Sequence, residues 1–313
     1  MKQICILGGS GFVGTALTQQ LSVAGYEVKV LTRRRESSKH LILIPNVNVV
    51  ECDVMNDIQL QENLKGAYAV INLIGVLHES KKFSFQRMHH DLPQRILKFC
   101  TKLGINRMIQ MSALQASEHA PSQYLKSKGL GEKFLLGQSK KINVTIIRPS
   151  IIFGRGDSFI NLFAKLIKFL PVILLAKPNA KFQPIYVENV ASAFVEAIDN
   201  PITYGKSYDL AGPTAYTFRE IIQYVAKVLN KKRLVIGLND VLSYCQAFLM
   251  ELMPIKLMTR DNLKSMSVES VSNNPFPAYL SFKPVAMEAI VPEYLANQNP
   301  RDTYNRYRSY AGR

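Results

Sequence analysis

The chain lacks tryptophan and has few residues that could form disulfides or hold a metal ion. Its four cysteines, Cys5, Cys52, Cys100 and Cys245, lie far apart and form no CxxC pair. Cys5 and Cys52 stand in apolar runs typical of strands, so we expect reduced, buried thiols in a cytosolic protein. The five histidines show neither an HExxH motif nor a Cys/His ligand spacing, and we therefore predict no metal site.

A long hydrophobic run is also missing. The longest uncharged apolar stretch lies near Phe169–Ala176, is far shorter than a bilayer requires and contains Pro171. A strand is predicted to begin near Ile4, so we expect no signal peptide before it. We expect a cytoplasmic protein that is soluble or, as the alternative, attached peripherally at the inner face of the membrane.

Acidic residues are scarce beside basic ones. The sequence has 23 Asp and Glu against 39 Lys and Arg, which gives a net charge of +16. Such a surface attracts anions, whether phosphorylated cofactors, acidic lipid headgroups or nucleic acid. Because no nucleic-acid-binding module is recognised and tryptophan is missing, nucleic acid is the weakest of these three partners. The 313 residues, of which 47% are hydrophobic, suffice for one large domain or a domain with an appended lobe.

Strand-like and helix-like segments alternate in the first half of the chain. The apolar runs are continuous in Val, Ile and Leu, which predicts a parallel sheet covered on both faces. We therefore expect an α/β fold, a Rossmann-type doubly wound parallel sheet over residues 1–150. The expected strands are Ile4–Gly8, Glu27–Leu31, Val47–Cys52, Ala69–Ile74, Arg107–Met111 and Val144–Ile147, and the expected helices are Val13–Ala24, Asp57–Leu64, Phe83–Leu103 and Tyr124–Gly137.

The pattern changes after Arg148-Pro149, where helical segments dominate. We expect a smaller, mainly helical C-terminal substrate lobe over residues 151–296, threaded with the sheet, and a basic tail over 297–313. The ligand cleft should lie between the two parts, at the carboxyl ends of the strands. The expected helices are Phe159–Leu170, Val187–Asp199, Phe218–Leu229 and Leu238–Met253, and the expected short strands are Phe182–Tyr186 and Ser207–Leu210.

The stretch ICILGGSGFVG at residues 4–14 predicts a dinucleotide site. It fits both GxGxxG and GxxGxxG, with a strand before it and a helix after it. Glycines let the backbone approach a pyrophosphate closely, and the free N–H groups of the helix that follows attract the same phosphates. The alternative is a tight strand–helix turn without a ligand.

The end of the second strand favours NADP(H) over NAD(H). An acidic residue there would grip a ribose 2′-hydroxyl, whereas an arginine suits a 2′-phosphate. The sequence reads Thr32-Arg33-Arg34-Arg35, and no acidic residue appears before Glu36. Arg33 is the best candidate, and a merely solvated loop is the alternative. Asp53, which follows the third strand, is placed to approach the adenine.

Tyr124 and Lys128 form a YxxxK pair. Residues four apart share one face of a helix, so a phenol and an ammonium should lie side by side. A cation favours the phenolate and lowers the pKa of a tyrosine, which then serves as an acid or base near neutral pH. Ser112, at the end of the fifth strand, could hold a substrate carbonyl. We therefore predict catalytic roles for Ser112, Tyr124 and Lys128 beside a nicotinamide.

These features together resemble the short-chain dehydrogenase/reductase superfamily, in its atypical or extended branch. The resemblance covers essentially the whole chain and is carried by Gly8-x-x-Gly11-x-x-Gly14, Asn72-Leu73-Ile74-Gly75, Ser112, Tyr124 with Lys128, and Arg148-Pro149-Ser150. The stretches NLIGVL, MSAL, YLKSKGLGEK, IRPSIIFGRGDSF, FQPIYVENVA and LMTRDNLKSM look like bacterial relatives of the 39 kDa accessory subunit of respiratory complex I. Those proteins stand close to NAD-dependent epimerase/dehydratase-type proteins.

The resemblance implies a set of cofactor contacts. It implies that Lys128 contacts the nicotinamide ribose and also lowers the pKa of Tyr124. With the glycine loop and the end of the second strand, the predicted cofactor-binding residues are Gly8, Gly11, Phe12, Val13, Gly14, Arg33, Asp53, Leu73, Ile74, Gly75, Lys128 and Pro149.

Three functions stay open at this point. The first is an NAD(P)H-dependent oxidoreductase acting on a hydrophobic, quinone-related carbonyl or hydroxyl. The second is a non-catalytic, cofactor-bound accessory or assembly protein of a respiratory or ubiquinone-synthesising complex, as the resemblance implies for mitochondrial members. The third is a nucleotide-sugar epimerase or dehydratase. Against it stand the short Ser112–Tyr124 spacing and the stretch YVENV at 186–190, although Arg155 could grip a diphosphate.

Two apolar segments with basic flanks could contact a membrane. They are Ser158–Lys177 and Leu238–Met258, and either suits an anionic lipid surface or an apolar substrate pocket. The alternative is ordinary packing of amphipathic helices on the core. The partners we expect are thus a small-molecule substrate and, in the alternative, a membrane surface or a respiratory complex.

Overall fold

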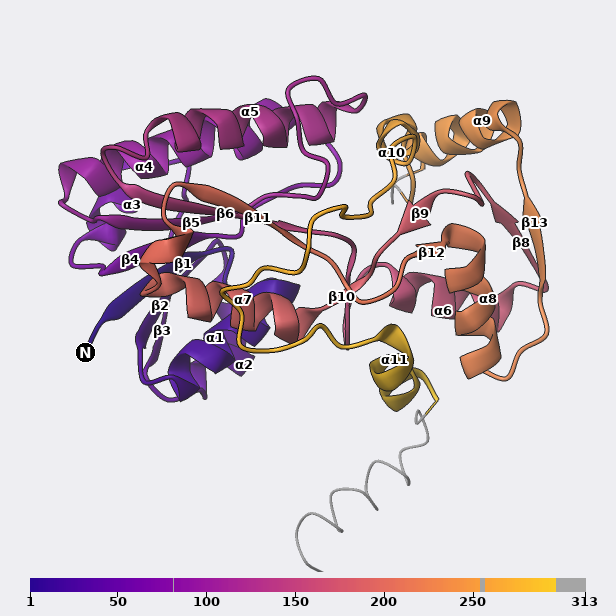
Figure 1. Ribbon diagram of the computed structural model, residues 1–313, viewed down its shortest axis with the longest axis horizontal. Coiled ribbons are helices and arrows are strands. Elements are labelled where there is room, and N and C mark those ends of the chain that lie inside the picture. The colour runs from indigo at the N-terminus through magenta and orange to yellow at the C-terminus, as the bar shows by residue number, and fades with distance from the viewer. Residues whose placement is uncertain (81, 254–256, 297–313) are drawn as a thin grey trace, which may run out of the picture.

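The computed structural model describes residues 1–80, 82–253 and 257–296. Its centre is a seven-stranded parallel sheet in the order β11-β6-β5-β4-β1-β2-β3 (Figure 1). This arrangement confirms the predicted doubly wound α/β fold. The strands are β1 Gln3–Leu7, β2 Glu27–Thr32, β3 Val47–Glu51, β4 Ala69–Asn72, β5 Arg107–Met111, β6 Asn143–Pro149 and β11 Lys206–Leu210.

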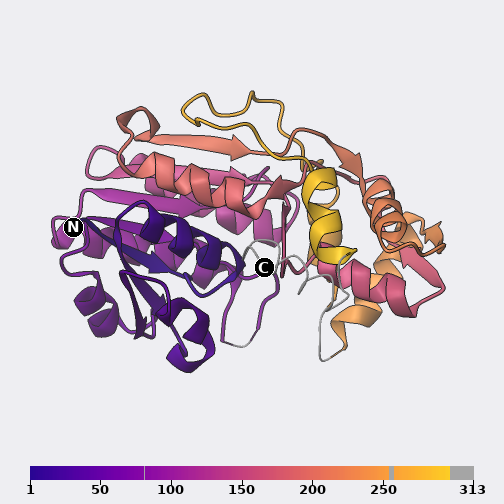
Figure 2. The same cartoon turned by 90° about the horizontal axis from the view of Figure 1, so that it is seen from below.

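Helices cover both faces of this sheet. On one face, α1 (Phe12–Val23) packs beside α7 (Val187–Ile198), and their apolar residues share a core with β1 and β2. The other face is covered by α3 (Asp57–Leu64), α4 (Leu92–Lys102) and α5 (Gln123–Gly137). Figure 1 shows the sheet between these two layers, and Figure 2 views the molecule from the side of α1 and α7. The short helix α2 spans Lys39–Ile42. Burial on both faces explains why the strands read as continuous apolar runs.

The C-terminal lobe lies beyond the carboxyl ends of the strands (Figure 1). Its own core joins α6, α8 and α11 through residues such as Phe218 and Val291. Outside the main sheet, β7 pairs with β10 and β9 pairs with β12. The remaining elements are α6 Ile160–Phe169, β7 Ile152–Phe153, β8 Val172–Leu175, β9 Lys181–Phe182, β10 Ile185–Tyr186, β12 Tyr216–Thr217, α8 Phe218–Val228, β13 Leu234–Gly237, α9 Asp240–Glu251, α10 Arg260–Ser265 and α11 Met287–Leu295.

Some sequence expectations need correction. The second expected short strand, Ser207–Leu210, is part of β11, which pairs with β6 at the edge of the main sheet, as a C-terminal part threaded with the sheet allows. The helix expected over Phe83–Leu103 is a π-helical turn, Gln86–Asp91, followed by α4. Pro93 has no N–H for the carbonyl of His89, which explains the change of hydrogen-bond register there. Cys245 on α9 is exposed rather than buried, whereas Cys5, Cys52 and Cys100 are buried.

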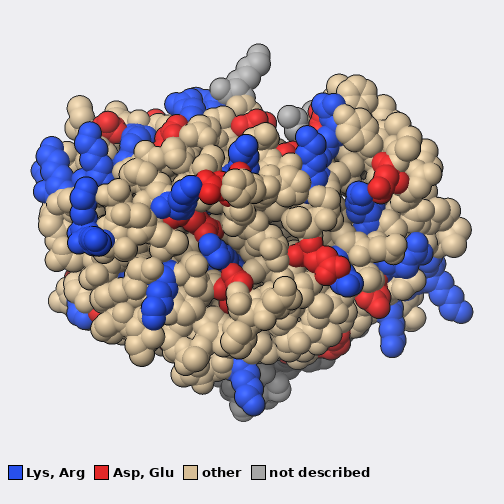
Figure 3. All heavy atoms as spheres, turned by 45° about the horizontal axis from the view of Figure 1, so that its top comes forward, with Lys and Arg blue, Asp and Glu red and all other residues tan. Residues whose placement is uncertain are grey.

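The expected basic tail, 297–313, lies outside the described residues. None of the helices in the described part of the chain combines the length and apolarity that crossing a bilayer requires. On the face shown in Figure 3, Lys and Arg are dispersed among uncharged residues and alternate with Asp and Glu.

Candidate dinucleotide and catalytic site

The glycine loop lies at the carboxyl end of β1 in the geometry that the motif requires. Gly8 has φ +81°, a conformation that other residues rarely adopt, and its carbonyl accepts from the N–H of Gly11 at 3.1 Å. A Cβ on Gly14 would lie 2.5 Å from the Gly8 carbonyl oxygen and 2.5 Å from the Cα of Gly9. The first turn of α1 therefore touches the loop directly, which only glycine permits.

The N-terminus of α1 is free to bind an anion. Gly11 is its N-cap and supplies no side-chain cap, and the first turn has no acidic residue. Phe12 is half-buried, while Val13 is buried in the core, so Val13 can offer a ligand only its backbone N–H. These N–H groups and the positive end of the helix dipole fit a pyrophosphate.

The end of β2 presents arginines and no carboxylate. The Ser10 and Thr32 hydroxyls lie 3.2 Å apart and join the loop to this strand. Arg33 is exposed, and its guanidinium lies 4.9 Å from the centre of the Phe83 ring. Arg35 is occupied, because its Nε donates to the Val49 carbonyl at 3.1 Å. Arg33 is thus the better placed of the two for a ligand.

Asp53 lies just beyond β3, at the same edge of the sheet. It is exposed, and its Oδ1 accepts from the N–H of Met55 at 2.9 Å. Its own N–H donates to Gln59 Oε1 at 2.9 Å. The second carboxylate oxygen remains available to a ligand.

The segment after β4 closes over the glycine loop. Asn72 is fully buried, and its side chain donates to Gln110 and accepts from the N–H of Ile74 at 3.1 Å. A Cβ on Gly8 would lie 3.2 Å from Ile74, and a Cβ on Gly75 would lie 3.1 Å from the Nζ of Lys128. The structure thus brings the loop, the 73–75 segment and Lys128 into one continuous surface. Leu73 is buried beneath this surface.

Lys128 is almost completely buried on α5. Its Nζ donates to the Met111 carbonyl at 3.2 Å. Burial lowers the pKa of Lys128 to about 8, and the carboxylate of Glu132 opposes that shift. A cofactor phosphate or ribose near this amine would favour its charged form.

Tyr124 differs from its expected electrostatics. Its ring is half-buried and makes edge contacts with Phe85 and His89, at 5.9 and 5.4 Å between ring centres. Burial raises the pKa of Tyr124 to about 12, whereas we expected Lys128 to lower it. The physical reason is that the Lys128 ammonium points to the Met111 carbonyl, so loss of solvent outweighs any attraction to the phenol.

Ser112 carries an unpartnered hydroxyl at the carboxyl end of β5. The residue is buried, and among the described residues its Oγ has no hydrogen-bond partner. The nearby Glu132 carboxyl, whose Oε1 is equally unpartnered, interacts with this hydroxyl, which lowers the pKa of Glu132 against the rise that burial causes. A buried hydroxyl without a partner is costly, and a ligand carbonyl or hydroxyl would satisfy it.

His89 joins two parts of the site and was not anticipated from the sequence. It is 2% exposed, and its Nε2 accepts from the N–H of Val76 at 3.0 Å. Its Nδ1 must then carry the proton and donates to Ser127 Oγ at 2.9 Å, and that hydroxyl donates to the Tyr124 carbonyl. Burial lowers the pKa of His89 to about 2, and the charge of Lys128 adds to the shift. A neutral imidazole thus links the segment after β4 to α5.

Small residues let α5 approach the π-helical turn closely. A Cβ on Gly131 would lie 2.1 Å from the His89 carbonyl oxygen, and a Cβ on Gly129 would lie 2.3 Å from the Ser117 backbone. The pattern GLG at 129–131, which the YLKSKGLGEK stretch contains, was the sequence signal for this contact.

The C-terminal lobe caps the helix that carries Tyr124. Asp261 on α10 accepts from the backbone N–H groups of Gln123 and Tyr124, at 2.8 and 3.0 Å. Ser265 donates to the hydroxyl of Ser122, the N-cap of α5, at 2.8 Å. These contacts fix α5 from a segment more than a hundred residues away, which no local pattern indicates.

The two remaining residues singled out from the sequence are Pro149 and Arg155. The carbonyl of Pro149, at the end of β6, accepts from the N–H of Leu114 at 2.9 Å. In the GRGD stretch, Asp157 accepts from the backbone of Phe159 and Ile160 and thereby fixes the start of α6. Arg155 is exposed beside it.

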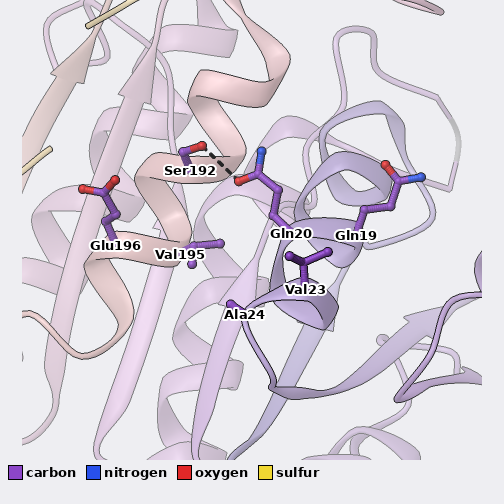
Figure 4. A pocket seen from close by; sticks show the side chains of 7 residues that line it. All are labelled: Gln19, Gln20, Val23, Ala24, Ser192, Val195 and Glu196. Atoms are coloured by element: carbon purple, nitrogen blue, oxygen red, sulfur yellow. Dashed lines mark hydrogen bonds between the residues drawn. The ribbon is translucent and has the colours of Figure 1, made fainter. Parts of the chain in front are cut away.

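A shallow groove of about 370 Å³ lies elsewhere, between α1 and α7, where Ser192 donates to Gln20 (Figure 4).

Known proteins share both the sequence pattern and the fold. The NAD dependent epimerase/dehydratase family model matches residues 4–211. NADH dehydrogenase (ubiquinone) 1 alpha subcomplex subunit 9, mitochondrial, of Arabidopsis thaliana is 34% identical over 72% of this chain, which spans 58% of that relative's length. Ceramide reductase of Caulobacter vibrioides is 27% identical over 76% of this chain and 74% of its own.

A solved structure supports the fold. The NAD complex of dTDP-glucose 4,6-dehydratase from Bacillus anthracis has a TM-score of 0.66 and 18% identity, over 77% of this chain and 85% of that one. The match to the family model includes the glycine loop, Ser112, the Tyr124–Lys128 pair and all seven strands of the sheet. The chain therefore belongs to the NAD dependent epimerase/dehydratase family.

Proposed function

We propose that the protein is an NADP(H)-dependent oxidoreductase that reduces a carbonyl, or oxidises a hydroxyl, on a hydrophobic and quinone-related substrate. The observation that carries the proposal is the buried, unpartnered hydroxyl of Ser112, which lies at the end of β5 near the helix bearing Tyr124 and Lys128. Within the described residues the Glu132 carboxyl lies beside this hydroxyl, and a substrate oxygen would offer it a further acceptor.

The residues present fit a dinucleotide. The loop of Gly8, Gly11 and Gly14 and the N-terminus of α1 would hold the pyrophosphate, because the backbone there is bare and uncapped. Arg33 would bind the 2′-phosphate, and Asp53 would approach the adenine. Lys128, beside Gly75, would hold the nicotinamide ribose. When bound, the dinucleotide supplies or accepts a hydride.

The chain's own groups then manage the proton and the substrate oxygen. Ser112 donates a hydrogen bond to the substrate carbonyl and fixes its position. Tyr124, whose pKa of about 12 keeps it protonated at neutral pH, gives its proton to that oxygen during reduction. Lys128, which donates to the Met111 carbonyl, holds the nicotinamide ribose beside Gly75.

The first experiment asks which dinucleotide the protein carries and whether it turns over. The protein would be purified without added cofactor and denatured, and the released molecules would be identified by mass spectrometry. A second sample would be mixed with NADPH and short-chain quinones or hydrophobic ketones and followed at 340 nm. We expect NADP(H) rather than NAD(H), and NADPH oxidation that depends on the added acceptor. Release of NAD(H) would overturn the cofactor choice, and stable NADPH with every acceptor would overturn catalysis.

A second function is favoured by the relatives. The Arabidopsis relative is named as a subunit of NADH dehydrogenase, and this chain shares 34% identity with it. In that case the protein is a cofactor-bound accessory or assembly protein of a respiratory or ubiquinone-synthesising complex. It would retain NADP(H) stoichiometrically without oxidising it, and it would co-purify with membrane-bound partners under mild detergent.

A further inference from the structure

Helix α9 exposes large apolar side chains, which is the reverse of the usual packing of an amphipathic helix. It buries its small residues, since Ser243 and Ala247 are both fully buried. Its large apolar residues face solvent instead, with Val241 70%, Leu249 63% and Leu252 70% exposed. At 100° per residue these three side chains lie on one side of the helix. The carboxylates at the two ends of α9 are neutralised, because Asp240 pairs with Lys177 and Glu251 pairs with Arg260.

The two-stranded ribbon of β8 and β13, which lies beside α9, also exposes apolar side chains. The parallel register pairs Val172 with Leu234 and Leu174 with Ile236. All four side chains are exposed, whereas Ile173 and Leu175 point into the lobe. The ribbon adjoins α9, because Gln246 donates to the Leu174 carbonyl at 3.1 Å (Figure 1). We call the four ribbon residues together with Val241, Leu249 and Leu252 the apolar shelf.

A basic groove borders the other end of the ribbon. It has a volume of about 430 Å³ and is lined by Lys227, Lys231, Lys232 and Arg233, with no acidic residue in its lining. No carboxylate of the described residues pairs with any of these four cations. Arg233 Nε donates to the Ile167 carbonyl at 2.8 Å, and Leu234 of the shelf is the next residue along the chain. Unpaired cations and exposed apolar side chains therefore meet at one edge.

We propose that the apolar shelf and the basic groove dock the protein onto the surface of an anionic phospholipid bilayer. Charge complementarity selects this occupant. An exposed apolar face bordered by unpaired cations fits a surface that places anionic headgroups over hydrocarbon. Apolar side chains enter the boundary between headgroups and acyl chains, while the lysines bind phosphates at the rim. This attachment is peripheral, in keeping with the short helices of the described chain.

The proposed docking surface lies close to α5, the helix that bears Tyr124 and Lys128. The shelf helix α9 packs against α10, and Asp261 of α10 accepts from the N–H groups of Gln123 and Tyr124. The inference extends the proposed function by placing the site beside a lipid phase, where apolar substrates dissolve. It does not depend on catalysis, because the surface and its charges exist whether or not the protein turns over.

The test is co-sedimentation of the full chain with vesicles, without cofactor or substrate. We expect binding to phosphatidylcholine vesicles that contain phosphatidylglycerol, weaker binding at high salt, and little binding to phosphatidylcholine alone. The double variants Leu249→Ser/Leu252→Ser and Lys231→Glu/Lys232→Glu should each bind at least about tenfold more weakly. All the altered side chains lie on the surface, and unchanged thermal unfolding would verify that these variants remain folded.

Matched controls lie on the sheet body. Leu43 is 87% exposed, and Lys140 and Lys141 form an exposed basic pair before β6. Leu43→Ser and Lys140→Glu/Lys141→Glu should leave vesicle binding unchanged. Equal losses in these controls, or unaltered binding by the shelf and groove variants, would overturn the proposal. So would a dimer, measured by light scattering, that Leu249→Ser/Leu252→Ser dissociates, because a second copy would then cover the shelf.

Discussion

The sheet body and the C-terminal lobe treat their apolar residues in opposite ways. The body hides them under helices on both faces of the sheet. Of 22 large hydrophobic residues exposed in the described chain, 14 lie in the two lobe segments 169–174 and 234–257. Burial in the body creates a rigid site with shifted pKa values, whereas exposure in the lobe creates a surface that needs a partner. The proposed chemical site thus lies in the body, and the proposed attachment surface lies in the lobe.

The largest expected effect is at the closest contact in the body. Gly14→Ala would place a Cβ 2.5 Å from the Gly8 carbonyl, so the loop must move away from α1. We expect NADPH binding to weaken about ten- to hundredfold, measured by fluorescence titration. Vesicle binding by the lobe should not change, which would show that the two regions act independently.

Gly137→Ala is the matched control for this change. Gly137 is the last residue of α5, and a Cβ there would meet nothing within 4 Å. That variant should bind NADPH normally and be slightly more stable. If Gly14→Ala bound NADPH as well as this control does, the loop would not be the pyrophosphate site.

The next effect is a pH dependence of the free energy of unfolding, caused by His89 in the sheet body. His89 has a pKa of about 2 in the folded protein, against 6.5 in the unfolded chain. Between these values the unfolded chain binds a proton that the folded protein does not, so stability falls as the pH drops below about 6.5. The slope from this group is about 1.4 kcal/mol per pH unit. Urea unfolding at pH 5, 6 and 7 would measure it.

Substitution of His89 separates this slope from those of other groups. His89→Gln should lower stability at pH 7, because Val76 and Ser127 lose their partner, and should remove the slope. His119→Gln, at a highly exposed histidine, should leave the slope as it is in the unaltered protein. A slope that persisted in His89→Gln would mean that another group causes it.

A smaller effect is expected where the two regions meet. Asp261→Ala removes the acceptor for the backbone of Gln123 and Tyr124, which is a helix-capping contact from the lobe to the body. We expect a loss of about 1 kcal/mol in the free energy of unfolding. Asp261→Asn, which keeps an acceptor oxygen, should lose less. Equal losses in both variants would show that the charge, and not the cap, stabilises the contact.

The smallest expected effect is a difference in reactivity between the thiols of the two regions. Burial raises the pKa of Cys5 and of Cys100 to about 12, and Cys52 is also buried. Cys245 is exposed on α9. In the native protein, a thiol reagent should modify Cys245 alone, and anionic vesicles should slow that reaction. Rapid modification of a second thiol would contradict the tight packing of the body.

The sequence predicted the body better than the lobe. The glycine loop, the six first strands and the Tyr124–Lys128 helix follow from local patterns, because each is built from neighbouring residues. The strand at Ser207–Leu210 was predicted but its partner was not, since pairing of β11 with β6 is decided by tertiary contacts. The lobe strand β8 was missed, because Val172–Leu175 reads as a continuation of the apolar helix before Pro171.

Several parts of the site could not be predicted, for a similar reason. The role of His89 depends on contacts with Val76 and Ser127, which are distant in the sequence. Spacing alone placed Lys128 on the same helix as Tyr124, but it could not show that the ammonium points to the Met111 carbonyl. Whether the predicted cofactor-binding residues, Arg33, Asp53 and Pro149 among them, contact a cofactor stays a prediction.

The central claim is that the buried body performs chemistry through Tyr124. The most direct measurement is the rate of NADPH oxidation at 340 nm with the best acceptor, compared between the unaltered protein and Tyr124→Phe, with the dissociation constant of NADPH measured for both. The account predicts that the substitution lowers the rate by about 10²- to 10⁴-fold and changes the dissociation constant little, because the phenol moves a proton and does not hold the cofactor. Equal rates in the two proteins would contradict it.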